Sequence, residues 1–202
     1  LTDDYDAAQE LVVIDVATGK EKRQVVARRA DTTWKHVALG AGGRLAALSR
    51  TGDEPEIQIW DVTAADVVRA WKPPVAVHPI VFSTSGELVA GTGSNSVFAW
   101  RAGTGELAFE RRLGVTSFLQ AGPDDTLWAL VYLDALIAID ANGATVRRYR
   151  GDSLTADALG FTKDGEVVAY DGSGVDTRAW VRATGQPVVY SATTPSHAVQ
   201  DR

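Results

Sequence analysis

The 202-residue sequence contains neither cysteine nor methionine. Without cysteine the chain can form no disulfide, no thiolate metal site and no thiol nucleophile. No apolar run approaches the roughly 18–20 residues of a membrane-spanning helix, and no basic segment followed by an apolar one indicates a signal peptide. We therefore expect a cytoplasmic protein with no membrane partner. Because the chain begins at Leu1 and has no methionine, we also expect its natural start to be missing.

The charge balance is acidic, with a formal net charge of −6 and a pI of about 5.0. A negative surface repels phosphate backbones, so we expect no nucleic-acid partner. The hydrophobic content of 45% and charged content of 23% are typical of a globular domain. Abundant Ala, Val, Arg, Gly and Asp suggest a GC-rich bacterial genome.

The chain is built from a repeat of about 40 residues. Similar strand ends recur with spacings of 46, 40, 39 and 41 residues, at Ile14, Trp60, Trp100, Ile139 and Trp180. Between these anchors, segments such as 80–91 (IVFSTSGELVAG) and 159–170 (LGFTKDGEVVAY) predict a strand, a tight turn and a second strand. Three series of strand-like segments share this one period, which indicates a single structural unit in repeated copies.

Glycine occupies most of the predicted turns, where a positive φ favours it. At the first turn of each unit we expect positive φ at Gly43, Gly86 and Gly165, with Asp125 in that place in the third copy. At the turn after each anchor we expect it at Gly19, Gly105, Gly143 and Gly185. The second copy has Ala65 and Asp66 there instead.

Four short antiparallel strands per period predict an all-β fold of β-propeller blades. We expect one domain over residues 1–202, with a half blade at 1–29 and full blades at about 34–71, 77–112, 115–150 and 156–191. The tail 192–202 would start a further blade, so the ring would be incomplete and the chain a segment of a longer protein. The alternative is a five-bladed ring in which the tail pairs with the half blade.

The chain resembles the WD-repeat family of propellers. The resemblance rests on Trp60-Asp61, on FSTSGELVAG (82–91) and on FTKDGEVVAY (161–170), and its repeats are degenerate. Segments such as IDVATGKE are similar to quinoprotein-type repeats as well. The WD-repeat resemblance implies a rigid platform for protein partners without chemistry of its own, often the sensing region of a bacterial multidomain protein.

The linkers between units and the loops between middle strands should lie together on one face and bind the partner there. On this loop face we expect partner-binding residues at Trp34, Trp71, Asp53, Glu54, Asp171 and Asp176. Packing between blades is the alternative role of Trp34 and Trp71. We expect no catalytic, cofactor-binding or metal-binding residue.

Three other patterns are compatible with ligand sites but are better explained as structure. Residues 91–96 (GTGSNS) could be a phosphate cradle or a plain turn, and residues 171–176 (DGSGVD) a calcium loop or a polar turn. His36, His78 and His197 would bind zinc only if they converged.

Two functions remain open. The first is a non-catalytic protein-interaction or sensing scaffold, whose remaining blades are supplied in cis or by another chain. The second is a ligand-binding or quinoprotein-like enzymatic propeller. The inner strands offer mainly apolar and small residues, which favours the first function.

Overall fold

The computed structural model describes residues 10–14, 17–25, 34–64, 66–150, 158–163, 166–170, 177–181, 183–184 and 186–188. The chain divides into two compact units, Leu1–Leu154 and Thr155–Arg202. Both are built from antiparallel sheets, and in the described ranges the only helical segments are two 3₁₀ turns, Ala41–Gly43 and Pro123–Asp125. No helix in this part of the chain has the length and hydropathy needed to cross a bilayer.

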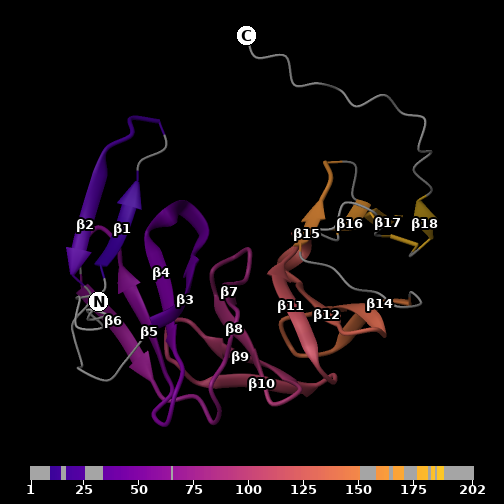
Figure 1. Cartoon of the computed structure of the whole chain (residues 1–202), viewed down its shortest axis with the longest axis horizontal. Helices are drawn as coiled ribbons and strands as arrows, with labels where there is room; N and C mark the ends of the chain where they lie inside the picture. Colours follow the sequence, from indigo (N-terminus) through magenta and orange to yellow (C-terminus); the bar gives the residue numbers. More distant parts are fainter. Residues whose placement is uncertain are drawn as a thin grey trace, which may run out of the picture. The chain divides into compact units, whose positions relative to one another are not determined.

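The described part of the first unit contains one two-stranded sheet and three four-stranded sheets, and each sheet follows the order of the sequence (Figure 1). The two-stranded sheet is formed by β1 (Glu10–Ile14) and β2 (Glu21–Val25). The first four-stranded sheet contains β3 (Trp34–Leu39), β4 (Leu45–Arg50), β5 (Glu56–Asp61) and β6 (Asp66–Trp71). The second contains β7 (Ile80–Phe82), β8 (Leu88–Gly93), β9 (Ser96–Arg101) and β10 (Leu107–Arg112). The third contains β11 (Thr116–Ala121), β12 (Leu127–Val131), β13 (Ala135–Ile139) and β14 (Thr145–Arg150).

In the second unit the described residues form one four-stranded antiparallel sheet in the same sequential order. Its strands are β15 (Ala158–Phe161), β16 (Glu166–Tyr170), β17 (Thr177–Val181) and β18 (Pro187–Val188). Leu159, Val167, Ala179 and Trp180 are buried in it.

The turns adopt the backbone conformation that the glycine pattern predicts. Gly43, Gly86, Gly105 and Gly143 have φ between 68° and 83°, and Asp125 replaces glycine with φ 56°. Such turns match the right-handed twist of the strands they join. The predicted turn glycines Gly165 and Gly185 lie outside the described residues.

Asp61 and Asp140 close the turn that follows the repeat anchor. The Asp61 carboxylate accepts hydrogen bonds from the backbone N–H groups of Thr63 and Ala64 and from Arg44 Nε. Asp140 likewise accepts the N–H groups two and four residues later. The aspartate of Trp60-Asp61 is therefore a turn-forming residue, while Trp60 packs in the core at 4% exposure.

The middle strands of each full sheet of the first unit are almost entirely buried, because both of their faces are covered. One apolar cluster joins the first sheet to the second and includes Ile57, Ile59, Val77, Val89 and Trp100. Another joins the second sheet to the third and includes Leu88, Val97, Leu127, Ile137 and Ile139. Strand pairing stays within each sheet, so the sheets associate face to face through side chains.

Outer-strand aromatics pack on turn glycines of the following sheet. A Cβ on Gly105 would lie 3.1 Å from the Trp71 ring, and a Cβ on Gly143 would lie 2.8 Å from the Phe109 ring. These two glycines therefore allow both the positive φ of the turn and the close contact between neighbouring sheets.

The β7–β8 and β11–β12 turns, at the same end of the second and third sheets as Gly105 and Gly143, are hydrogen-bonded across the sheet boundary. Asp125 accepts the backbone N–H of Ser85 at 2.8 Å and its hydroxyl at 2.9 Å, and the Thr84 hydroxyl donates to the Gly122 carbonyl at 2.6 Å. Burial raises the pKa of Asp125, but the hydrogen bonds from Ser85 and Ser83 outweigh it and hold the pKa below its usual range.

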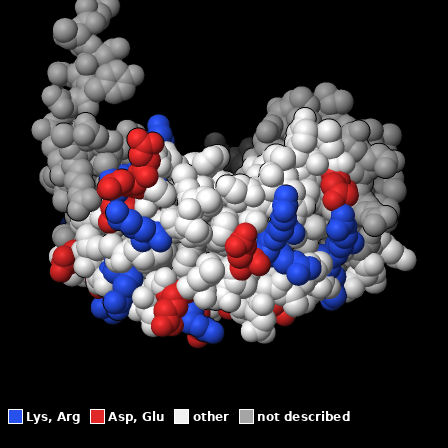
Figure 2. Space-filling view, turned by 90° about the horizontal axis from the view of Figure 1, so that it is seen from below, with Lys and Arg blue, Asp and Glu red and all other residues white. Residues whose placement is uncertain are grey.

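The predicted fold class is confirmed. The chain is all-β, and its described residues form four four-stranded blades and a half blade of propeller type. Strand pairing between these sheets does not close them into a barrel. Lys and Arg lie beside Asp and Glu on the face seen in Figure 2, so that face carries mixed charge.

Candidate functional site

The linkers and the middle loops of the first unit meet at one edge, which we call the linker edge (residues 51–55, 72–79, 93–96, 113–116 and 132–134). The Asn95 carbonyl accepts the N–H groups of Leu113 and Gly114, both at 3.0 Å. Tyr132 N–H donates to the Val115 carbonyl at 2.8 Å. The prediction that linkers and middle loops share one face is confirmed in this part of the chain. The corresponding loops 151–156 and 171–176 lie outside the described residues.

Two glycines of the GTGSNS segment allow the preceding linker to pass close to the sheet. A Cβ on Gly93 would lie 2.5 Å from the Ala76 carbonyl oxygen, and one on Gly91 would lie 3.0 Å from Val77 Cβ. Both glycines belong to strand β8, and the turn itself is Ser94-Asn95, with φ 47° and 66°. The glycines are therefore required by packing, not by a phosphate.

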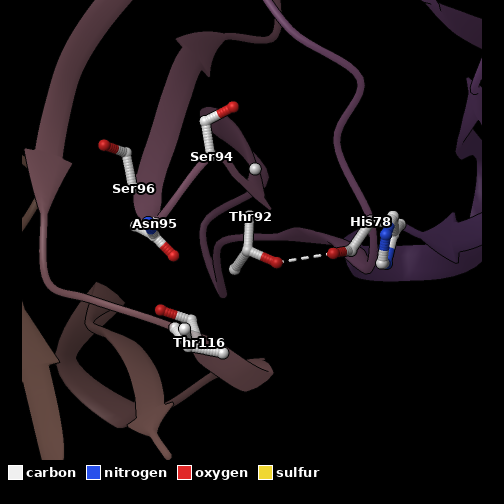
Figure 3. Close-up of a pocket in the computed structure, with 8 residues that line it drawn as sticks. His78, Thr92, Ser94, Asn95, Ser96 and Thr116 are labelled. Atoms are coloured by element: carbon white, nitrogen blue, oxygen red, sulfur yellow. Dashed lines mark hydrogen bonds between the residues drawn. The ribbon is translucent and has the colours of Figure 1, made fainter.

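A cavity of about 180 Å³ opens at this linker edge (Figure 3). It is lined by His78, Thr92, Gly93, Ser94, Asn95, Ser96, Val115 and Thr116. The Thr92 hydroxyl donates to the His78 carbonyl, and His78 N–H donates back to the Thr92 carbonyl at 2.8 Å. The Ser96 hydroxyl is bound to Glu110 at 3.0 Å. Hydroxyl and amide groups thus dominate a lining that contains no carboxylate, lysine or arginine.

Two of the three histidines come together beside this cavity. The rings of His36 and His78 are stacked, with centroids 5.5 Å apart and planes at 14°. Burial lowers the pKa of His36, and repulsion from His78 and Lys35 lowers it further, so the neutral imidazole is favoured. His197 lies outside the described residues, and within them no three metal-ligating side chains of His, Cys, Asp or Glu form a group.

Exposed apolar side chains gather next to the cavity, at the β12–β13 turn and the linker beside it. Val115, Tyr132 and Leu133, which we call the apolar tip, are 62%, 52% and 50% exposed. Leu133 has φ 56°, a left-handed conformation that costs a non-glycine residue about 1–2 kcal/mol. An ion pair of 2.6 Å between Asp134 and Arg148 braces the turn. An exposed leucine held in a strained turn is a feature that suggests a binding role.

The two predicted tryptophans pack within the protein. Trp71 is half-buried, its ring lies 6.1 Å from that of Trp100 in the next sheet, and its indole nitrogen is buried without a hydrogen-bond partner. Trp34 is half-buried against the cluster of Ala46, Leu48, Trp60 and Val62 on its own sheet. These placements favour the alternative role of packing for both residues.

The predicted acidic residues differ in their surroundings. Asp53 is exposed, and Glu54 lies 3.6 Å from Lys72 and 4.0 Å from Arg50. The guanidinium of Arg50, which is 3% exposed, lies 3.1 Å from Glu56. Glu54 thus belongs to a small charge network on the linker edge. The other two residues, Asp171 and Asp176, lie outside the described residues.

The apolar tip was not among the residues predicted to bind a partner, although its sequence carries one signal. The other middle loops of the chain are rich in Gly, Ser, Asp and Glu and contain no aromatic residue or leucine, whereas residues 132–135 read YLDA. Apolar side chains are unexpected in this three-residue loop, and leucine does not favour the positive φ that Leu133 adopts.

Comparison with known proteins supports the fold alone. No family model and no curated protein sequence matches the chain. Among solved structures, hydrazine synthase of Kuenenia stuttgartiensis is similar, with a TM-score of 0.66 and 15% identity over 81% of this chain. The match covers 50% of the hydrazine synthase chain, so this chain spans about half of that length. At this identity the likeness concerns the arrangement of four-stranded antiparallel sheets, and the chain is accordingly a protein with β-propeller-type blades.

Proposed function

We propose that the chain is a non-catalytic protein-interaction module of WD-repeat-like character, which binds a protein partner at the linker edge. The observation that carries the proposal is the apolar tip beside the polar cavity. A partner could cover Val115, Tyr132 and Leu133 while a polar group enters the cavity. Interfaces commonly combine a central apolar or aromatic anchor with a polar surround in this way.

The energetics of the apolar tip support this role. Full burial of a side chain such as valine or leucine is worth roughly 1.5–3 kcal/mol, so three such side chains can supply much of a micromolar interaction of about 8 kcal/mol. The hydrogen bond from Tyr132 to Val115 and the ion pair at Asp134 fix the backbone beforehand. A preorganised loop loses less conformational entropy when it binds.

The WD-repeat-like part of the proposal is supported by Trp60-Asp61 and by the hairpin at 82–91. Trp60 is buried and Asp61 closes the following turn, which are structural roles compatible with that repeat. The mixed charge in Figure 2 fits a protein partner better than an extended polyanion.

Selection of peptides tests the proposal. A phage-displayed library of random peptides is panned on the chain, and enriched peptides are measured by fluorescence anisotropy against variants. Tyr132→Ser and Leu133→Asn should each weaken binding at least about tenfold, the effect of losing an interface anchor. Because asparagine tolerates the left-handed conformation, Leu133→Asn should leave the melting temperature unchanged or raise it.

The matched control is Val68→Asn, which removes an apolar side chain that is 47% exposed on the outer strand β6. It should leave peptide binding unchanged. If the enriched peptides bound both tip variants as tightly as the original chain, or if no peptide were enriched, the proposed binding face would be wrong.

A second candidate function, the binding of a small polar ligand, is favoured by the cavity alone. Its volume of about 180 Å³ corresponds to roughly six water molecules and lies below the roughly 300–1,000 Å³ of most ligand pockets. A fragment library screened by thermal shift would support this function if binders lost their effect on Thr116→Val. Protein binding remains the function that the geometry supports best.

A further inference from the structure

Two threonines of the linker-edge cavity have hydroxyl protons that are already engaged within the protein. Thr92, which is 5% exposed, donates its hydroxyl proton to the His78 carbonyl. The half-buried Thr116 donates its hydroxyl proton to the Gly114 carbonyl at 3.2 Å. A threonine hydroxyl has one proton and two lone pairs, so both groups can offer a ligand only lone pairs. Turning either hydroxyl would break its bond to a backbone carbonyl.

The Ser94-Asn95 turn lines the same cavity with polar groups that are not engaged. Both residues are exposed, and within the described part of the chain neither side chain has a hydrogen-bond partner. The Ser94 hydroxyl and the Asn95 NH2 group can therefore donate hydrogen bonds to a ligand. The cavity thus combines acceptors at the threonines with donors at the turn.

No ionised side chain faces the cavity to balance the charge of a ligand. Its lining contains no carboxylate, lysine or arginine. His78 directs its carbonyl toward Thr92, whereas its ring points away and stacks on His36 (Figure 3). The Ser96 hydroxyl, which donates to Glu110, is also directed away from Thr92 (Figure 3). Because an unpaired charge is costly to remove from water, the cavity favours a neutral group.

A primary carboxamide meets these conditions. Its NH2 group has two donors, one for each threonine hydroxyl, and its carbonyl can accept a hydrogen bond from Asn95 or Ser94. A hydroxyl has a single donor, and an ammonium or a carboxylate carries an unpaired charge. At about 180 Å³ the cavity is smaller than the roughly 300–1,000 Å³ of most small-molecule pockets, so it fits a single side chain.

We propose that the cavity binds the side-chain carboxamide of an asparagine or glutamine of the protein partner. This inference rests on the proposed function, because it names the polar group that enters the cavity beside the apolar tip. Val115 belongs both to the cavity lining and to the apolar tip, and it is 62% exposed. A polypeptide that covers the tip therefore places a neighbouring side chain at the cavity, with its methylene groups against Val115.

Butyramide is the probe for the cavity alone. Titrated into the isotope-labelled chain, it should cause saturable NMR shift changes at the backbone amides of Ser94, Asn95 and Thr116 at millimolar concentration. Butyrate and butylammonium are of similar size but carry a charge, so they should cause no such changes.

Two variants of the chain identify the groups that bind the probe. Thr116→Val keeps the shape of the side chain but removes its lone pairs, so it should weaken butyramide binding about tenfold. Asn95→Asp tolerates the same left-handed turn but loses the NH2 donor, and it should also weaken binding. The matched control is Thr145→Val, at an exposed position of β14, which should bind butyramide normally.

Peptides test the carboxamide in the partner. Peptides enriched by panning on the chain should carry an asparagine or glutamine at a constant distance from their apolar residues. Replacing it by the isosteric aspartate or glutamate should weaken binding about tenfold or more. Thr116→Val should weaken binding of the original peptide but not of the replaced one, because the two changes remove the same contact.

Several results would overturn the proposal. They are the absence of saturation with butyramide, equal binding of either ion, and undiminished binding of butyramide to both Thr116→Val and Asn95→Asp. Peptides that need the apolar tip but no carboxamide would also overturn it, and would leave the proposed function standing. Butyramide binding without any enriched peptide would refute the proposed function and, with it, the partner assigned to the cavity.

Discussion

Alanine at position 143 would test how the second and third sheets are held together. Gly143 lies in the β13–β14 turn with φ 83°, against the ring of Phe109 in the preceding sheet. An added Cβ would lie 2.8 Å from Phe109 Cγ and 3.0 Å from its Cβ. Phe109 is 9% exposed and belongs to the cluster between these sheets, so its ring has little space to move.

The expected loss of folding stability on Gly143→Ala has three contributions. A non-glycine residue at positive φ costs about 1–2 kcal/mol, and overpacking costs about 1–3 kcal/mol. Replacing glycine by alanine also reduces the entropy of the unfolded chain, which returns roughly 0.4–1 kcal/mol. Gly143→Ala should therefore destabilise the protein by about 1–4.5 kcal/mol.

Alanine substitutions at two other glycines separate the backbone contribution from the overpacking contribution. Gly42 has φ 73° with no atom within 4 Å of an added Cβ, so Gly42→Ala measures the net backbone cost alone, about 0–1.5 kcal/mol. Gly103 has open space and no positive φ, so Gly103→Ala should be nearly neutral. Urea unfolding followed by tryptophan fluorescence gives the three free energies of unfolding.

A double-mutant cycle between Gly143 and Phe109 tests whether their contact causes the loss of stability. Phe109→Leu shortens the side chain, so the loss caused by Gly143→Ala should be smaller in that background by about 0.5–3 kcal/mol. The reasoning is refuted if Gly143→Ala costs no more than Gly42→Ala, or if the two substitutions are additive.

Three other substitutions have defined outcomes. Asp125→Asn should lower the free energy of unfolding by about 1 kcal/mol after allowance for partial exposure. Because the pKa of Asp125 is lowered in the folded state, this loss should be present above about pH 4 and vanish as the pH falls through the folded-state pKa. Thermal melts measure the loss, and the control Glu87→Gln should have little effect in them. The lowered pKa of His36, due first to burial and then to His78, means that protonation below about pH 6.5 opposes folding. Melting temperatures from pH 7.5 to 5 should fall less for His36→Gln than for the original chain. Gly93→Ala should lower stability by about 1–3 kcal/mol by calorimetry, because the new Cβ meets a backbone carbonyl at 2.5 Å.

The strands and turns could be predicted because their determinants are local. Alternation of apolar residues, an anchor every 40 residues or so and glycine at the tight turns indicated four-stranded units. The structure has these units, including the replacement of glycine by Asp125 at φ 56°. Trp60-Asp61 fits the same rule, because the aspartate closes its turn with backbone N–H groups two and three residues away.

The candidate site could not be predicted in the same way, because it depends on contacts between repeats. The stacking of His36 on His78 joins residues of two units. The cavity needs linker 113–116 to hydrogen-bond to the turn at Asn95. The sequence left Trp71 with two roles, partner binding and packing between blades, and the position of Trp100 in the next sheet favours packing.

By itself, the sequence determined the period, the strand and turn pattern and hence the class of fold, since these follow from side-chain alternation and backbone sterics within a few residues. The tertiary structure alone decided which side chains face solvent at the linker edge and at β3. Val37 and Phe82 are both apolar residues of inner strands, yet one is 60% exposed and the other 4%. The difference arises from which strand lies against each, and no local pattern contains that information.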